Sequence, residues 1–103
     1  MARFEYEAIY NGRDQDDDLV RDLKKVLNKA SNKLKLSPLE CDGRYVSGWT
    51  IPQENREVQL GIREAIKFAT ATGQAYIAIC GEEKDILATK SKLLSVIRGL
   101  ELH

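Results

Sequence analysis

The chain has 103 residues, of which 43% are hydrophobic and 31% charged, and its 16 basic residues are balanced by 16 acidic ones. This length suits one domain that buries about 65% of the unfolded chain's surface, so neither a disulfide nor a metal is needed for stability. The zero net charge argues against a protein dedicated to holding phosphate backbones. The longest apolar runs, such as residues 75–80, are only a few residues long. They are far shorter than the stretch of about 20 apolar residues that a membrane-spanning helix needs.

The first residues carry no apolar signal segment, so we expect a cytoplasmic protein without a membrane partner. Residues 4–10 then alternate in character, with Phe4, Tyr6 and Ala8 on one side and glutamates on the other. This period of two predicts a strand. An Asn-Gly pair marks the turn that ends it.

The following segment predicts a helix. Its apolar residues recur in steps of three and four and so share one stripe, namely Leu19, Val20, Leu23, Val26, Leu27, Ala30 and Leu34. Aspartates at residues 14–18 lie at the positive end of this helix and lysines lie near its negative end. These acids suit helix capping rather than a calcium loop, which needs a glycine at its sixth position. Pro38 prevents the helix from continuing.

Residues 39–51 predict a hairpin, because two short extended segments, residues 39–41 and 45–51, flank an Asp-Gly turn signal. Pro52 closes the second strand and suits the first turn of a second helix, which we expect to end at Gly73. The core stripe of that helix would comprise Val58, Ile62, Ala65, Ile66 and Ala69.

Residues 75–80 form a continuous apolar run between glycines, which predicts a strand covered on both faces. Acidic residues from Glu82 to Asp85 then open a third helix that ends near Gly99. The order is therefore strand, helix, strand, strand, helix, strand, helix.

That order resembles the ferredoxin-like (split βαβ) plan with one extra C-terminal helix. We expect a single α+β domain with a four-stranded antiparallel sheet, in which the strands of Cys41 and Cys80 are opposite edges. Such a placement excludes a disulfide between them. If residues 39–51 hold only one strand, the alternative is a small βαβαβα sandwich with a parallel sheet.

The sequence offers no recognisable catalytic, metal-ligating or cofactor motif. The two cysteines are far apart and the only histidine is His103, so a zinc site or a Ser-His or Cys-His pair is not favoured. The carboxylates on the predicted helices have ordinary surface spacings. We therefore expect a non-catalytic chain without a cofactor.

The preferred function is a protein-interaction or regulatory module that forms a homo-oligomer. Three amphipathic helices and four strands supply more apolar faces than one helix–sheet core needs. Leu60 and Phe68 lie off the main stripe of the second predicted helix and are candidate interface residues. Tyr76 belongs to a predicted uncharged edge strand, residues 76–80, through which two copies could pair in a symmetric dimer.

The alternative function is nucleic-acid binding. Arg21, Lys25 and Lys29 are spaced by four and share one face of the first helix, and Lys33 extends this row of cations. Such a row could follow a phosphate backbone. Aromatic residues on an open sheet face could also stack on bases, and the candidates are Phe4, Tyr6, Tyr10, Tyr45, Trp49 and Tyr76.

Overall fold

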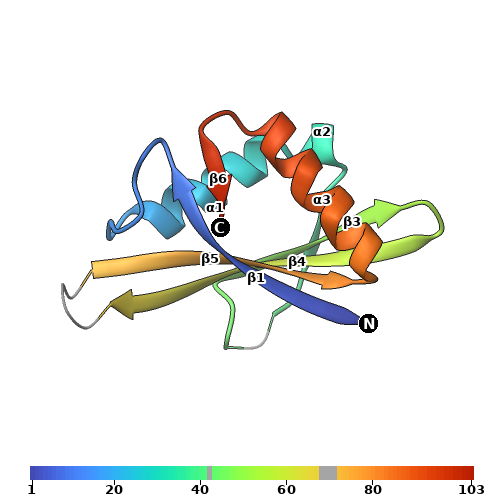
Figure 1. Cartoon of the computed structure of the whole chain (residues 1–103), viewed down its shortest axis with the longest axis horizontal. Coiled ribbons are helices and arrows are strands. Elements are labelled where there is room, and N and C mark those ends of the chain that lie inside the picture. Colours follow the sequence, from blue (N-terminus) through green and yellow to red (C-terminus); the bar gives the residue numbers. More distant parts are fainter. Residues whose placement is uncertain (42, 68–71) are drawn as a thin grey trace.

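An antiparallel sheet forms one layer of the fold, and helices cover one of its two faces (Figure 1). The computed structural model describes residues 1–41, 43–67 and 72–103. Within these residues the strands are β1 (Ala2–Tyr10), β2 (Ser37–Leu39), β3 (Ser47–Gln53), β4 (Arg56–Lys67), β5 (Thr72–Gly81) and β6 (Leu100–Leu102). The helices are α1 (Leu19–Lys29), α2 (Ser31–Leu34) and α3 (Glu83–Val96).

The six strands lie in the order β2-β3-β4-β5-β1-β6, and every neighbouring pair in this described sheet is antiparallel. The expected four-stranded ferredoxin-like sheet is therefore wrong, and so is the alternative with a parallel sheet. Four elements form near the positions that their patterns predict. They are the strands β1 and β5, at residues 4–10 and 75–80, and the helices α1 and α3, which begin at Leu19 and Glu83. β2 and β3 also pair, but β2 lies at Ser37–Leu39 and not at residues 39–41, and Asp42 of the predicted turn lies outside the described residues.

Two strands differ from the prediction: β4 replaces the second predicted helix, and β6 follows α3 at the end of the sheet. Val58 and Ile62 are four residues apart and fit a helical stripe, but they also fit a strand in which Leu60 lies between them on the same face. All three side chains are buried. Ala69 of the predicted stripe lies outside the described residues.

β5 lies between β4 and β1, so Cys80 is in the middle of the sheet and not at an edge. Cys41 follows the edge strand β2. Both thiols are free, and both line one small cavity together with Tyr45 and Gly61. The expectation that these cysteines mark opposite edges was wrong for Cys80.

The core lies between the helices and the central strands. Successive side chains of a strand point to opposite faces, so each central strand sends every second residue toward the helices. The largest fully buried side chains come from α1, β3, β4, β5, α3 and the α2 turn, and they are Leu19, Leu23, Leu27, Leu34, Ile51, Val58, Leu60, Ile62, Ile77, Ile79, Ile86 and Leu93. No helix among the residues described is long and apolar enough to cross a lipid bilayer.

The described residues between β2 and β3, 40–41 and 43–46, lie on the side of the sheet that the helices leave open (Figure 1). There the Tyr45 ring lies against Gly61, and a Cβ added at that glycine would be only 2.9 Å from Cδ1 of the ring. The Cys41 thiol occupies the space beside Gly48 in the same way. These two glycines therefore let the connection pack directly on the sheet.

Candidate interaction edge

β1 is paired along most of its length on one side and along only its C-terminal half on the other. β5 accompanies it from Ala2 to Ala8, whereas β6 pairs with it only from Ala8 to Tyr10. One further residue of the chain joins β6, because the backbone of His103 exchanges two hydrogen bonds of 2.8 and 3.0 Å with Glu7. Figure 1 shows β6 as a short strand, with the N-terminal half of β1 running on past it.

The unpaired half of β1 directs two sets of backbone groups outward. Alternate residues of a strand point their N–H and C=O groups to the same side. Glu7 points these groups toward His103, so Glu5 and Arg3 point theirs to the same side. No residue within the described ranges pairs with either of them there. Two donors and two acceptors are thus available to a further strand.

The side chains of this edge on the open face form an ion-pair network. Arg3 Nη2 lies 2.8 Å from Oε1 of Glu5, and Arg63 of β4 reaches both oxygens of the same carboxylate at 3.0 and 3.4 Å. Burial alone would raise the pKa of Glu5, but the hydrogen bonds from Arg63 and Arg3 hold this pKa below its ordinary value. Glu5 is therefore a carboxylate flanked by two guanidinium groups.

Two tyrosines hold these arginines in place. The Arg63 guanidinium lies 4.6 Å from the centre of the Tyr76 ring, and that of Arg3 lies 5.4 Å from the Tyr45 ring. A guanidinium is attracted to the face of an aromatic ring, so each of these contacts favours one orientation of the arginine side chain. The two tyrosine rings thus help to position the guanidinium groups beside Glu5.

The helix side of the same edge is apolar. Phe4 and Tyr6 meet edge to face with ring centroids 6.5 Å apart, and the Lys90 ammonium lies 4.5 Å from the centre of the Tyr6 ring. Lys90 therefore marks the side of α3 that faces β1. Leu87 and Leu94 lie on that side, three residues before and four residues after it, and they are 50% and 38% exposed.

The interface residues predicted from the sequence do not lie together at this edge. Leu60 is 1% exposed and belongs to the core under the helices, so it is not an interface residue of this fold. Phe68 lies outside the described residues. Tyr76 is partly exposed on the open face, but its strand is central and cannot serve as a pairing edge. Sequence reasoning missed Arg3, Glu5, Leu87 and Leu94, because only the sheet order shows that they share an edge.

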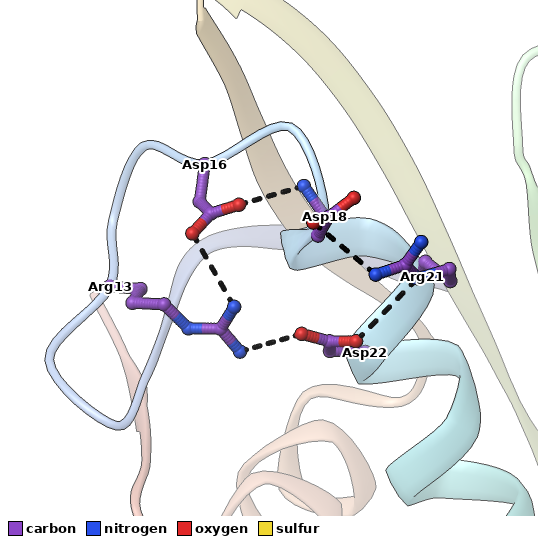
Figure 2. Close-up of polar contacts among 5 residues, drawn as sticks. All are labelled: Arg13, Asp16, Asp18, Arg21 and Asp22. Carbon is purple, nitrogen blue, oxygen red and sulfur yellow. Dashed lines mark hydrogen bonds and ion pairs between the residues drawn. The ribbon is translucent and has the colours of Figure 1, made fainter.

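Acidic residues before α1 and in its first turn form ion pairs with two arginines, as Figure 2 shows. Arg13 contacts Asp16 at 3.4 Å and Asp22 at 2.9 Å, and its hydrogen bond holds the pKa of Asp22 below the ordinary value. Arg21 contacts Asp18 at 3.3 Å and Asp22 at 3.7 Å. Asp18 is the N-cap residue, yet its side chain makes no capping hydrogen bond. The predicted capping by carboxylates is thus replaced, at Asp18, by pairing with Arg21.

This pairing removes Arg21 from the predicted row of cations. Lys25, Lys29 and Lys33 remain together and line two adjoining hollows of about 200 and 280 Å³. Tyr10, Val26 and Lys29 line both hollows, Asp22 also lines the first, and Arg98, which follows α3, is the third cation of the second. The basic patch is defined here as Lys25, Lys29, Lys33 and Arg98.

These features define the chain as a small α+β sheet protein with one half-open edge on β1. No protein-family model, curated protein or solved structure matches the chain in comparisons with known proteins. Its function is accordingly inferred from the geometry of its own residues.

Proposed function

We propose that the chain is a small protein-interaction module that accepts a β-strand at the open half of β1. The observation that supports this function is the outward-facing backbone of Arg3 and Glu5, which the described strands leave unpaired. Proteins usually cover or interrupt such edges, because a free edge is a template for another strand. Strand addition is also a recurrent way of binding a partner, with backbone hydrogen bonds supplying much of the affinity.

The two faces of the edge specify what the added strand should carry. On the open face it meets the charges of Arg3 and Glu5, so it needs charged residues of opposite sign at alternate positions. On the helix face it meets Phe4 and the exposed leucines of α3, Leu87 and Leu94, so the intervening residues should be apolar.

The compartment proposed for this module is the cytoplasm. Free thiols at both cysteines suit a reducing compartment of this kind.

A proline at position 5 tests this function. The Glu5 N–H points away from β5, so Glu5→Pro removes a donor of the open edge and leaves the ladder between β1 and β5 intact. Glu5→Ala is the matched control, because it removes the same side chain and keeps the N–H. Circular dichroism and thermal melting establish that both variants are folded.

Each variant and the wild-type chain are then used to capture partners from the native host, and each captured complex is studied by amide hydrogen exchange. We expect one partner to be captured by the wild type, more weakly by Glu5→Ala because the carboxylate of the charged face is gone, and not at all by Glu5→Pro. In its complex the exchange of the Arg3 and Glu5 amides should be slowed. Equal capture by Glu5→Pro, or unchanged exchange at these two amides, would overturn the function.

A second candidate function is nucleic-acid binding at the basic patch. The supporting observation is that Lys25, Lys29, Lys33 and Arg98 surround two adjoining hollows that also expose Tyr10. Binding of a fluorescent single-stranded oligonucleotide should then weaken steeply with salt and be lost in Lys25→Glu/Lys29→Glu. Absence of binding at low salt, or equal binding by the double variant, would exclude this candidate.

A further inference from the structure

We infer that the strand accepted at this edge is β1 of a second copy, so that two chains form a two-fold dimer with one continuous sheet. This inference rests on the proposed function and names its partner. It follows from the pairing registers that the edge allows, from the charges on one face and from the apolar side chains on the other.

The backbone permits few registers. Two antiparallel β1 strands must place their outward-facing residues opposite one another, because only these carry free N–H and C=O groups. One two-fold register sets Arg3 opposite Arg3 of the second copy, which brings like charges together. Another sets Glu5 opposite Glu5, and it also needs the far side of Glu7, which His103 already occupies.

The remaining register sets Arg3 opposite Glu5 of the second copy and Phe4 opposite its own equivalent. It pairs residues 2–6 of both chains, which is the length that β6 and His103 leave free. On the open face the two arginines and two glutamates then alternate in sign around a square. Glu5 would contact Arg3 of its own chain, Arg3 of the second copy and Arg63.

The helix face supports the same arrangement. Phe4 and its equivalent would form a pair without backbone hydrogen bonds, the kind in which facing Cα atoms are about 4.5 Å apart and side chains are close. Leu87 and Leu94 lie on the side of α3 that overlooks this junction, and the second copy would cover part of their exposed surface. Large exposed leucines beside a free edge are thus accounted for by one partner.

Light scattering across a range of concentrations provides the first experiment, with two charge variants. Arg3→Glu sets glutamate opposite glutamate in the proposed register, and Glu5→Arg sets arginine opposite arginine. We expect the wild type to be dimeric and each variant alone to dissociate at least tenfold more readily. An equimolar mixture of the two variants should recover the dimer, because every facing pair is then of opposite charge. Failure of the mixture to recover it would overturn the register.

Cross-linking provides a readout of which residues face each other in the dimer. In a Cys41→Ser/Cys80→Ser background, Phe4→Cys should give a disulfide-linked dimer with oxidised glutathione, because its equivalents face each other within bonding reach. Glu5→Cys is the matched control, since its equivalents lie on a diagonal roughly 7–8 Å apart and should cross-link poorly. Equal cross-linking at both positions would contradict the inference.

The failures of the two proposals are distinguishable. A chain that stays monomeric at every concentration, yet protects the Arg3 and Glu5 amides when a host partner binds, retains the proposed function and excludes the second copy. A chain in which these amides are protected by neither partner nor self-association excludes both.

Discussion

Arg56 of β4 holds the Asp85 carboxylate in the first turn of α3 through two hydrogen bonds, with Nε and Nη2 donating at 2.8 and 3.1 Å. The Asp85 side chain is only 6% exposed, so this pair is shielded from water on the carboxylate side. It fixes the start of α3 against β4. The hydrogen bonds from Arg56 also hold the pKa of Asp85 below its ordinary value.

This pair should make the stability of the chain depend on acid pH. A carboxyl group whose pKa is lowered by folding contributes stability above its unfolded pKa of about 4 and loses it as the pH falls through the folded value. We expect Asp85→Asn to lower the melting temperature at neutral pH and to flatten its decline between about pH 5 and pH 2. Melting curves followed by circular dichroism across this range provide the measurement.

Glu83 supplies the control for that experiment, because it is exposed in the same first turn of α3. Glu83→Gln removes a similar charge from the positive end of the helix without touching Arg56. A decline with pH that is equally flattened in both variants would show that the helix dipole, and not the Arg56 pair, sets the acid dependence.

The turn between β3 and β4 is made by Glu54 and Asn55, and Glu54 adopts a positive φ of 58°. A residue with a Cβ is strained in this conformation, whereas glycine is not. Glu54→Gly should therefore raise the free energy of unfolding by about 0.5–1 kcal/mol in urea titrations. Asn55→Gly, at a residue without a positive φ, should give no gain, and an equal gain there would contradict the explanation.

The same turn explains why the sequence misled at β4. A hairpin is recognised by a glycine or Asn-Gly pair in its turn, and Glu54-Asn55 supplies neither. Pro52 meanwhile looked like the first residue of a helix, although it lies within β3 opposite Glu57. With both local signals pointing to a helix, the strand character of Leu60 between Val58 and Ile62 was outweighed.

The elements that could be predicted are those whose patterns are unambiguous over their whole length. The alternation in β1, the wide apolar stripe of α1 and the apolar run of β5 each allow one interpretation. The candidate edge could not be predicted in the same way. That β5 and not β4 flanks β1, and that β6 pairs with the C-terminal half of β1, follows from contacts between distant segments. The local sequence around Arg3 and Glu5 does not indicate which strands pair with β1.

Thr89 in α3 is fully buried, and its hydroxyl has no hydrogen-bond partner in the part of the chain that the structure describes. A buried polar group without a partner costs stability, because it has given up its hydrogen bonds to water. Thr89→Val keeps the branched shape and removes the hydroxyl, so it should raise the free energy of unfolding by about 1 kcal/mol. Thr89→Ala should not give this gain, because it also leaves a cavity. A loss of stability in the valine variant would show that the hydroxyl has a partner after all, such as a buried water.

Leu60 and Leu87 separate the core from the proposed interface. Leu60 is 1% exposed beneath the helices, so Leu60→Ala should lower the free energy of unfolding by about 2–5 kcal/mol and leave any pairing at β1 unaffected while the chain stays folded. Leu87 is 50% exposed on the side of α3 above the β1 edge, so Leu87→Ala should change the stability of the monomer by no more than about 0.5 kcal/mol. Its effect should instead appear as weaker dimerisation. Urea titration of dilute samples measures the stability of the monomer, and light scattering of concentrated samples measures dimerisation. A Leu87→Ala variant that dimerises like the wild type would place this leucine outside the interface.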